Sequence, residues 1–379
     1  MFLKDIQLVN FKNYAEASVD FAEKVNAVVG ENGSGKTNLL DAIHYLSFCK
    51  SYFSAHDHQS IRFNSDFFAI HGEYVGYDDG RTCKISCTFK RNGRKMMKLN
   101  AKEYERLSDH IGQYPLIMVA PVDSNLIHEG SELRRKFFDM IISQFDKEYL
   151  HILINYQKLV GQRNALLKQM FESGQYDASY IQIYDSQLIP LNEAIFAKRA
   201  DFLTGIQPVF QQYYNYLSDN KEIVQIDYLS TLKEMPIAES FQRNAQADYS
   251  AGYTTAGIHK DDFNFLMNGN SLKRYSSQGQ QKSFLLALKL SQFDYYFERK
   301  KMKPILLLDD IFDKLDEKRT SRLLQLVGDN HFGQVFLSDT DRNRIDRILN
   351  AHQIQHKILE VNGGQISSQE SENLPKSNS

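Results

Sequence analysis

The sequence has no tryptophan, only three cysteines, and no apolar run long enough to span a bilayer. Disulfide frameworks and cysteine-based metal sites need paired or clustered cysteines, so we expect reduced thiols and no such metal site. The first residues lack the apolar core of a secretory signal, so we expect a cytoplasmic protein without a membrane partner. These shortages argue against secreted disulfide scaffolds and membrane-spanning proteins.

An excess of charge of one sign is also missing. The chain carries 45 Lys and Arg against 47 Asp and Glu, a formal net charge of -2. Binding to nucleic acid would therefore depend on a local patch of cations. The composition, 42% hydrophobic and 24% charged, is that of a globular protein, and 379 residues are enough for two or three domains.

One motif organises the chain. Residues 25–29 read as a buried strand, residues 37–46 read as an amphipathic helix, and the sequence G-x-x-x-x-G-K-T lies between them. Strand, glycine-rich loop and helix are the context of a phosphate-binding loop, in which backbone N–H groups point at anionic oxygens. The loop residues are Gly30, Glu31, Asn32, Gly33, Ser34, Gly35, Lys36 and Thr37.

The motif assigns roles to its last two residues. We expect Lys36 to reach the β- and γ-phosphates of ATP from a solvent-facing loop, and the Thr37 hydroxyl to ligate Mg²⁺. A second acidic site completes this chemistry, because the apolar run 305–308 ends in Asp309 and Asp310. Asp309 is placed to hold the Mg²⁺, and Asp310 to orient or deprotonate the attacking water. A solvated acid pair at the end of a strand is the plainer interpretation.

Periodicity divides the chain into four parts. Residues 1–130 contain strands at 2–10, 15–21 and 25–29 and a β pattern over 67–100, which predicts a mixed sheet around one helix. Residues 131–220 are helical, with a turn near 174–179 between two long antiparallel helices.

Residues 221–361 return to a strand and helix pattern, and residues 362–379 have a composition typical of a disordered tail. The expected class is α/β, with a helical domain inserted into the α/β part. The later elements are strands at 223–229, 262–267, 304–310, 334–338 and 357–361, and helices at 278–297, 316–327 and 341–350.

A third motif precedes the acid pair. Ser277, Gln278, Gly279 and Gln280 open the helix over 278–297 and resemble the S-G-G-Q signature of ABC-type ATPases, with Gln278 replacing the first glycine. A serine and a glycine at a helix N-terminus can bind an anion. Alone, Ser277 would be read as an ordinary N-cap, but the order of the three motifs favours the signature.

Taken together, these motifs resemble the RecF family, bacterial recombinational-repair ATPases that are related to the SMC proteins. The resemblance runs from residue 1 to about residue 350. It implies an ABC-type ATPase head with a short helical arm in place of long coiled coils. The segments that carry it are 8–14 (L-V-N-F-K-N-Y), 30–37, 256–262 (A-G-I-H-K-D-D), 277–282 and 308–316.

The resemblance also implies a function. It implies DNA-stimulated ATP hydrolysis, a homodimer that forms on ATP with Ser277, Gly279 and Gln280 acting in trans, and binding to gapped, junction, single- and double-stranded DNA. It further implies cooperation with RecR and RecO in loading RecA. Lys12 and Asn13 match family positions that approach nucleotide. The segment Leu337 to Thr340 lacks a switch histidine, and no Q-loop glutamine is assigned.

Two other functions share these motifs. An ATPase subunit of a membrane transporter would have the loop, the signature and the acids, but not the helical insertion. A structural tether that uses ATP only to dimerise would lack a catalytic acid, so Asp310 argues against it.

The DNA surface is assigned from charge. Six cations and no acid fall within residues 90–102, around Asn92-Gly93, a dipeptide that predicts a hairpin whose two turn residues have positive φ. Such a ribbon can follow a phosphate backbone. The alternative is a solvated hairpin whose lysines protect an edge strand, and the sequence does not decide between the two. The cations are Lys90, Arg91, Arg94, Lys95, Lys98 and Lys102.

Overall fold

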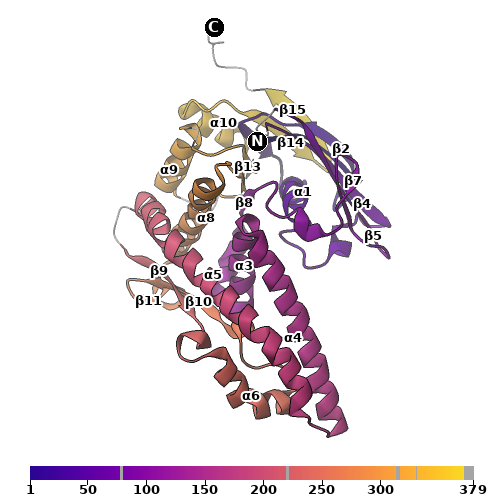
Figure 1. Cartoon of the computed structure of the whole chain (residues 1–379). Helices are drawn as coiled ribbons and strands as arrows, with labels where there is room; N and C mark the ends of the chain where they lie inside the picture. Colours follow the sequence, from indigo (N-terminus) through magenta and orange to yellow (C-terminus); the bar gives the residue numbers. More distant parts are fainter. Residues whose placement is uncertain (77–79, 219–221, 313–315, 330, 371–379) are drawn as a thin grey trace. The chain divides into compact units, whose positions relative to one another are not determined.

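The computed structural model describes residues 1–76, 80–218, 222–312, 316–329 and 331–370 (Figure 1). The chain divides into two compact units. The head unit comprises Met1–Asp123, Tyr216–Asp219 and Lys282–Ser379. The arm unit comprises Ser124–Asn215 and Asn220–Gln281. Each unit has its own sheet or sheets and its own buried core, and each is described separately below.

The first sheet of the head unit is antiparallel, with strand order β2-β1-β4-β5-β6-β7. Its inward positions are apolar and fully buried, for example Ile6 and Leu8 on one strand and Ile85 and Cys87 on another. This alternation is the pattern of a sheet with one covered face. The strands are β1 (Phe2–Phe11), β2 (Tyr14–Asp20), β4 (Phe67–Val75), β5 (Cys83–Lys90), β6 (Met96–Leu99) and β7 (Lys102–Glu103).

The second sheet of the head unit has strand order β15-β14-β3-β13-β12-β8. Five neighbouring strands are parallel, and β15 adds an antiparallel edge. Four of the parallel strands, β3, β8, β12 and β13, are buried at every residue, as strands covered on both faces are. The strands are β3 (Val25–Val29), β8 (Leu116–Val119), β12 (Ile305–Leu308), β13 (Val335–Asp339), β14 (Lys357–Asn362) and β15 (Gln365–Glu370).

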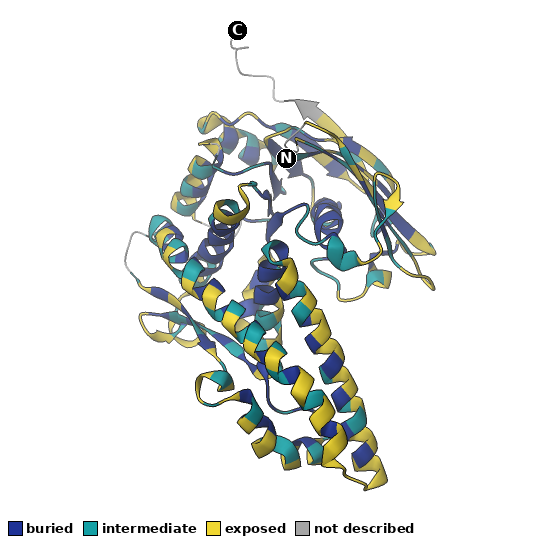
Figure 2. Ribbon diagram, viewed as in Figure 1, coloured by how far each residue is buried: buried dark blue, intermediate teal, exposed yellow. Residues whose placement is uncertain are grey.

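Helix α1 (Lys36–Phe48) lies between these two sheets and packs against strands of both. It is therefore buried on nearly all sides, and Figure 2 shows it almost entirely dark blue. The prediction of an amphipathic helix here was wrong, because a second sheet covers the face that would otherwise meet water. The other head elements are η1 (Asp57–Ser60), η2 (Leu107–Asp109), η3 (Pro121–Ser124), α9 (Glu317–Gly328) and α10 (Arg342–Ala351).

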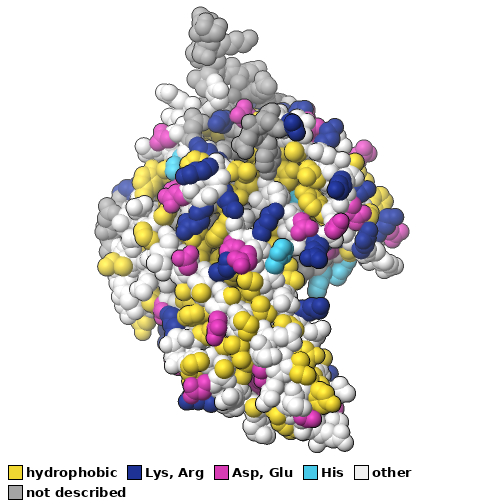
Figure 3. Space-filling view, in the orientation of Figure 1, with side chains coloured by type: hydrophobic (Ala, Val, Ile, Leu, Met, Phe, Trp, Pro, Cys, Tyr) yellow, Lys and Arg dark blue, Asp and Glu magenta, His cyan; other side chains and the backbone are white. Residues whose placement is uncertain are grey.

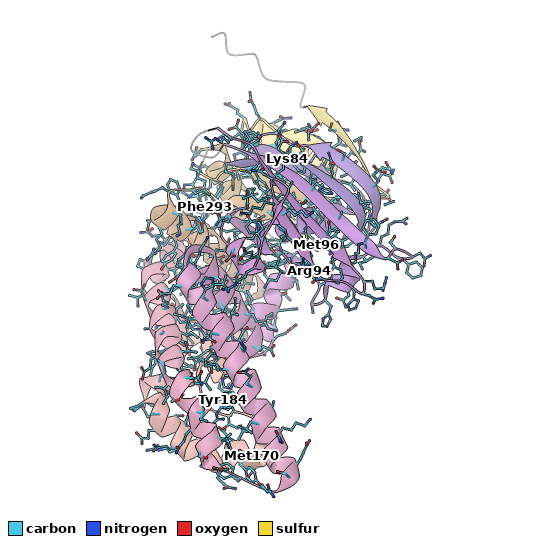
Figure 4. All side chains as sticks on the ribbon, turned by 45° about the vertical axis from the view of Figure 1, so that its right-hand side comes forward. Lys84, Arg94, Met96, Met170, Tyr184 and Phe293 are labelled. Atoms are coloured by element: carbon cyan, nitrogen blue, oxygen red, sulfur yellow. The ribbon has the colours of Figure 1, made fainter. Side chains whose placement is uncertain are left out.

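The arm unit is built on two long antiparallel helices that lie side by side in Figures 1 and 4, α4 (Lys147–Ser173) and α5 (Ala178–Ser218). Gly174 ends α4 in the left-handed conformation, with φ 68°. At this end Leu167, Met170 and Ile181 form a small core (Met170 is labelled in Figure 4). The other helices are α2 (Asn125–His128), α3 (Ser131–Phe145), η4 (Thr231–Lys233), α6 (Ile237–Ala251), η5 (Ile258–Lys260) and α7 (Leu272–Tyr275).

A three-stranded sheet, of order β11-β10-β9, completes the arm unit. Its strands are β9 (Val224–Leu229), β10 (Asp262–Met267) and β11 (Asn270–Ser271). The ring of Phe263 on β10 packs at a tilt of 36° against Phe138 of α3, with centroids 4.3 Å apart. The predicted return to the head at residue 221 differs from this division, because these strands pack against the arm helices. Helix α8 (Gln278–Lys300) begins in the arm unit and continues in the head unit.

Two buried arginines hold the arm together. Arg163 on α4 donates to Asp185 on α5 at 2.8 Å and to Asp248 on α6 at 2.6 Å. Arg199 on α5 donates through its Nη2 to Asp139 on α3 at 3.0 Å. Its Nη1 donates to the carbonyl oxygen of Ile258 at 2.9 Å, within the segment 256–262 that the family resemblance singled out. That segment therefore connects the arm helices to β10.

Three predictions, about a turn, the end of the chain and the first sheet, need correction. Neither Asn92 nor Gly93 has positive φ, because β5 and β6 stop pairing at Thr88 and Met96 and a wider loop joins them. Residues 365–370, assigned to a disordered tail over 362–379, form β15 and pair with β14. The remainder of that tail, residues 371–379, lies outside the described residues. The predicted single sheet of the first 130 residues is two sheets.

Candidate functional site

The phosphate loop connects β3 to α1 as the motif predicted. Gly30 and Gly35 have φ of 154° and 124°, a range that side chains rarely adopt. Space is also limited at both glycines. A Cβ on Gly30 would lie 2.2 Å from the Val361 carbonyl oxygen, and one on Gly35 would lie 2.6 Å from the Asn13 amide nitrogen. Both positions therefore require glycine.

Lys36 is folded back on this loop. Its Nζ donates to the carbonyl oxygens of Gly30 at 2.8 Å and Glu31 at 3.0 Å, and the residue is 4% exposed. The expectation of a lysine on a solvent-facing loop was wrong for the side chain itself. Glu31, Asn32 and Gly33 are exposed, whereas Ser34, Gly35 and Lys36 are buried. The Lys36 ammonium group is thus held by the backbone carbonyl groups of the loop itself.

The second acidic site lies beside the loop. The Thr37 hydroxyl contacts both carboxylate oxygens of Asp309, at 3.0 and 3.1 Å. Asp309 is 3% exposed, and its Oδ1 also accepts a bond from the Ser338 hydroxyl at 2.8 Å. Burial raises the pKa of the Asp309 carboxyl, the neighbouring Asp310 adds to the rise, and the bonds from Ser338 and Thr37 oppose it.

Asp310 is held in an unusual backbone conformation. Its φ is 46°, and its backbone N–H donates to the Ser338 hydroxyl at 2.8 Å. One carboxylate oxygen, Oδ1, is buried and has no hydrogen-bond partner in the described part of the chain. A buried carboxylate oxygen without a donor is costly and is typical of a functional position. It can accept a proton or a hydrogen bond from a molecule that enters the site.

These oxygens suit Mg²⁺. Thr37 and Asp309 offer a hydroxyl and a carboxylate, which are hard donors, and the open oxygen of Asp310 lies on the next residue. Among the described residues no group of three or more His, Cys, Asp or Glu could hold a metal by itself. A Mg²⁺ here would therefore complete its coordination with water and substrate phosphates, which is how this ion is usually bound.

The two residues before β2 have different roles. The Asn13 side chain donates to the Ser34 carbonyl oxygen at 2.9 Å and accepts from Asn38 at 2.8 Å, so Asn13 supports the phosphate loop. Lys12 instead forms an ion pair of 2.6 Å with the buried Asp41 of α1. The structure therefore brings Asn13, but not the Lys12 ammonium, into direct contact with the loop.

Sequence analysis missed the β14–β15 hairpin as part of this site. Its turn residues Gly363 and Gly364 have φ of 54° and 85°, and the N–H of Gly364 donates to the Ser34 carbonyl oxygen at 3.2 Å. Gly-Gly followed by an alternating pattern is a hairpin signal, which could have indicated this strand. The polar composition of the segment hid it.

A buried ion pair on α8 was also missed. Lys289 lies 3.0 Å from Asp123 and donates to the Tyr52 hydroxyl at 2.7 Å and to the Met118 carbonyl oxygen at 2.9 Å. Burial lowers the pKa of Lys289, and the charge of Asp123 opposes this. These residues fix the chain directly after β8, the strand that pairs with β12 before Asp309. No local sequence pattern marks such a pair.

The signature residues belong to the arm unit, whereas the phosphate loop belongs to the head unit. The Ser277 hydroxyl accepts from the Gln280 N–H at 3.2 Å, and the Gln280 side chain accepts from the Ser277 N–H at 2.7 Å. This reciprocal pair is a capping box. The plainer N-cap interpretation thus describes the local structure, and it leaves Ser277 exposed at the start of α8, with Gly279 half-buried beside it.

Some cations of the basic hairpin are exposed to solvent, whereas another is paired with groups of the protein. Lys90, Arg91 and Arg94 are exposed, and Lys98 is half-buried. Lys95 is paired with Asp57 at 2.7 Å and donates to the Cys49 carbonyl oxygen at 2.5 Å. A DNA contact by this hairpin would therefore use Lys90, Arg91 and Arg94 more readily than Lys95.

Comparisons with known proteins identify the family that this chain resembles over nearly its whole length. The model of the RecF/RecN/SMC N-terminal domain matches residues 2–358. The chain is 44% identical over 361 residues to the DNA replication and repair protein RecF of Flavobacterium johnsoniae, covering 95% of this chain and 100% of that protein. It is 43% identical over 367 residues to that of Bacteroides thetaiotaomicron, covering 97% and 98%.

Solved structures give the same result. A recombination mediator RecF solved with ATP, described as part of the RecFOR pathway, superposes with a TM-score of 0.88 at 28% identity, covering 97% of each chain. An Smc head bound to a winged-helix domain of ScpA superposes with a TM-score of 0.57 at 16% identity, covering 98% of each chain, which shows a shared fold. The fold predicted from the motifs, an ABC-type head with a helical insertion, is confirmed.

No helix in the described ranges has the length and apolarity to cross a membrane.

Proposed function

The chain belongs to the RecF family within the RecF/RecN/SMC group, and on that premise we propose that it is an ATPase that binds DNA during replication and recombinational repair. The relatives at 43–44% identity are named for DNA replication and repair. They give no support to the alternative of a transporter subunit. The arm unit, built on two long helices, also has no counterpart in the transporter hypothesis.

One observation carries the nucleotide assignment. Thr37, at the start of α1, and Asp309, at the end of β12, are 272 residues apart in sequence and 3.0 Å apart in the structure. In this arrangement Lys36 would bind the β- and γ-phosphates of ATP, and Thr37 and Asp309 would hold Mg²⁺. The Mg²⁺ supplies charge to the phosphates when bound. The buried, unpaired oxygen of Asp310 accepts a proton from the attacking water.

ATP is proposed to act by closing a homodimer. The exposed start of α8, with Ser277, Gly279 and Gln280, faces the γ-phosphate bound by a second copy, because a serine hydroxyl and helix N–H groups form an anion site. A two-fold dimer would bury two ATP molecules at one interface. The solved relative's description places it in the RecFOR pathway, which supports RecR and RecO as partners.

The proposed DNA surface is the exposed part of the basic hairpin. Lys90, Arg91 and Arg94 extend from one end of the antiparallel sheet, and Figure 4 labels Arg94 and Lys84 toward opposite ends of this ribbon. Phosphate contacts by such cations do not depend on sequence. The alternative role, protection of the sheet edge, predicts that replacing them leaves DNA affinity unchanged.

Light scattering and DNA affinity, each measured with ATP, with ADP and without nucleotide, test the proposal. We expect the dimer mass and tight DNA binding only with ATP. Ser277→Arg should keep ATP binding but lose the dimer, because a bulky cation would obstruct a second copy. Ser250→Arg, on an exposed position of α6, is the matched control. A monomer that binds DNA equally well in all three conditions would contradict the proposal.

A further inference from the structure

Phe63 is the most exposed large hydrophobic residue among those that the structure describes, at 84% exposure. It lies in the head unit, in the loop between η1 and β4. Hydrogen bonds fix this loop on both sides of the ring. The Arg62 N–H donates to the Asn10 carbonyl oxygen at 2.8 Å, and the Ser65 N–H donates to the Arg62 carbonyl oxygen at 3.0 Å. The loop is therefore held with the phenyl ring in solvent.

The loop is joined to the end of the basic hairpin. The Arg91 N–H donates to the Asp66 carbonyl oxygen at 2.7 Å, and the Arg91 guanidinium donates to the Ser65 carbonyl oxygen at 3.1 Å. We call residues 62–66 and 90–94 together the ribbon tip. Its exposed cations are Arg62, Lys90, Arg91 and Arg94. Figure 3 shows dark blue side chains along this side of the molecule, over β4 and β5.

Few acids offset these cations. Asp66 is the exposed acid of the ribbon tip, and Glu103 pairs with Arg94 at 2.9 Å while leaving that arginine 78% exposed. The ribbon tip is thus positive, although the chain as a whole carries a formal charge of -2. The combination of one exposed aromatic ring and flanking cations favours a ligand that has both flat apolar faces and phosphates.

A protein partner fits this surface less well. Besides Phe63, the exposed large hydrophobic nearest in sequence is Phe67, which is 37% exposed. Two such side chains supply much less apolar area than the roughly 800 Å² that each partner buries in a stable interface. No other aromatic ring packs against Phe63 within the described ranges, so the exposed ring has no role in the core.

We propose that Phe63 stacks on an unpaired base of single-stranded or gapped DNA, while Arg62, Lys90, Arg91 and Arg94 contact the phosphates on either side. This inference rests on the DNA-binding function proposed above and adds a preference for DNA structure. Bases in an intact duplex are already stacked on their neighbours and do not offer a face to Phe63. The cations bind duplex and gapped DNA alike, and Phe63 favours the gap.

The absence of tryptophan makes a direct test possible. The variant Phe63→Trp carries a single indole, whose fluorescence is quenched when a base stacks on it. We expect quenching by DNA with an unpaired gap and little change with a fully paired duplex of the same length. Phe63→Ala should lose about 10-fold in affinity for gapped DNA, the effect of one lost stacking contact, and keep its duplex affinity.

Two controls separate stacking from charge. Phe171 on α4 is also exposed, at 54%, so Phe171→Trp and Phe171→Ala should change neither fluorescence on DNA binding nor affinity. Arg91→Ala should weaken binding to gapped and to duplex DNA together. It should also reduce the slope of log affinity against log salt concentration by about one unit, the effect of one lost phosphate contact. All of these positions are exposed, so the variants should fold.

Three results would overturn the inference. If Phe63→Ala binds gapped DNA like the wild type while the wild type binds DNA, the stacking role is lost and the proposed function remains. If Phe63→Ala instead abolishes an ATP-dependent dimer with DNA affinity intact, the surface belongs to a second copy of the chain. If the wild type binds no DNA with ATP present, both the proposed function and this inference fail.

Discussion

The head unit and the arm unit both bury charged side chains, but the two units differ in how far oppositely charged groups surround those side chains. In the arm, Arg199 is 1% exposed and donates to both oxygens of Asp139. In the head, the hydrogen bonds that the Asp309 carboxylate accepts from described residues come from the hydroxyls of Thr37 and Ser338, and Asp310 has a buried oxygen with no donor among those residues. The head also pairs some buried acids with cations, such as Asp41 with Lys12. Among the described residues, however, Asp309 and Asp310 form no ion pair, in contrast to Asp139 in the arm.

This difference separates structural from functional burial. A buried carboxylate paired with a guanidinium is stable only while both partners remain, so the arm charges bind the helices to one another. A buried carboxylate without a partner gives up stability, and it suits a site whose cation and proton come from the ligand. Four substitutions test this comparison, in order of decreasing effect.

Asp310→Asn should slow ATP hydrolysis by about 10²- to 10⁴-fold, because an amide cannot accept the proton of the attacking water. The backbone should be unaffected, since asparagine tolerates the positive φ of 46° found at this position. Thermal stability should be equal or slightly higher, because an unpaired buried charge is removed. Phosphate release and melting temperature measure the two effects.

Asp20→Asn, the same change at an exposed position of β2, is the control and should alter neither quantity. The expected state of Asp310→Asn is a dimer that retains ATP. Turnover at the wild-type rate would assign the proton acceptor to another group and would remove the functional half of the comparison.

Arg199→Met should destabilise the protein by about 3–5 kcal/mol, because Asp139 and Asp261 would stay buried without their cation. Urea unfolding followed by circular dichroism measures this loss. Arg243→Met is the matched control, since Arg243 is 61% exposed and paired with Glu239 on one helix of the same unit. A loss below about 1 kcal/mol for Arg199→Met would mean that the arm does not depend on its buried ion pairs.

Much of the head was predictable because its signals are local. The segment 25–29, read as a buried strand, predicted β3 with the bounds that the structure has, and the apolar run before Asp309 predicted β12. The phosphate loop and the acids followed from residue type and spacing. Their contact, Thr37 with Asp309, required the family motif, since no local pattern joins two segments so far apart.

What failed depended on distant partners. Asn268-Gly269 forms the tight turn that this dipeptide predicts, with φ of 50° and 75°, because Met267 and Asn270 pair directly beside it. Asn92-Gly93 does not, because the preceding Arg91 donates its backbone N–H to the Asp66 carbonyl oxygen, and the Gly93 N–H donates to the Lys90 carbonyl oxygen. The same dipeptide thus takes two conformations, and the difference lies in tertiary contacts. The buried Lys289 likewise depends on a partner remote in sequence, Asp123. The strand β15 is different, because it pairs with the adjacent β14 and its polar composition hid it.

In the arm, Arg199 offsets the burial of Asp261 less completely than that of Asp139. We therefore expect the free energy of unfolding to depend on the titration of Asp261. Burial raises the pKa of Asp261 to about 6, with the Tyr228 hydroxyl and Arg199 opposing the shift. Because the folded pKa exceeds the unfolded one, this group contributes stability below pH 4 that is lost as pH rises through about 6. The shift of about two units corresponds to roughly 1–3 kcal/mol.

Unfolding free energies between pH 4 and 7 check this pH dependence, with Asp261→Asn as the comparison. The amide keeps the shape and hydrogen bonding of the protonated acid, so the variant should lose this component of the pH dependence. Asp227→Asn, on the neighbouring strand and half-exposed, is the control and should keep it. An unchanged pH profile in Asp261→Asn would mean that Arg199 compensates Asp261 fully.

The smallest loss of stability is expected for a solvent-exposed ion pair of the arm. Lys136 and Glu132 on α3 lie 2.6 Å apart, at an i,i+4 spacing, with side chains 71% and 72% exposed. Lys136→Ala should cost less than about 1 kcal/mol, because solvent already stabilises both charges and salt screens their attraction. The hydrogen bond from Lys136 lowers the pKa of Glu132, so this small contribution is present at neutral pH and is lost as pH falls through the folded pKa.

A double-mutant cycle with Glu132→Ala, at low and at 1 M salt, isolates the pair. A coupling energy similar to the loss in Arg199→Met would show that burial is not what distinguishes the arm's ion pairs, and the contrast with the head would then rest on the unpaired oxygen of Asp310 alone.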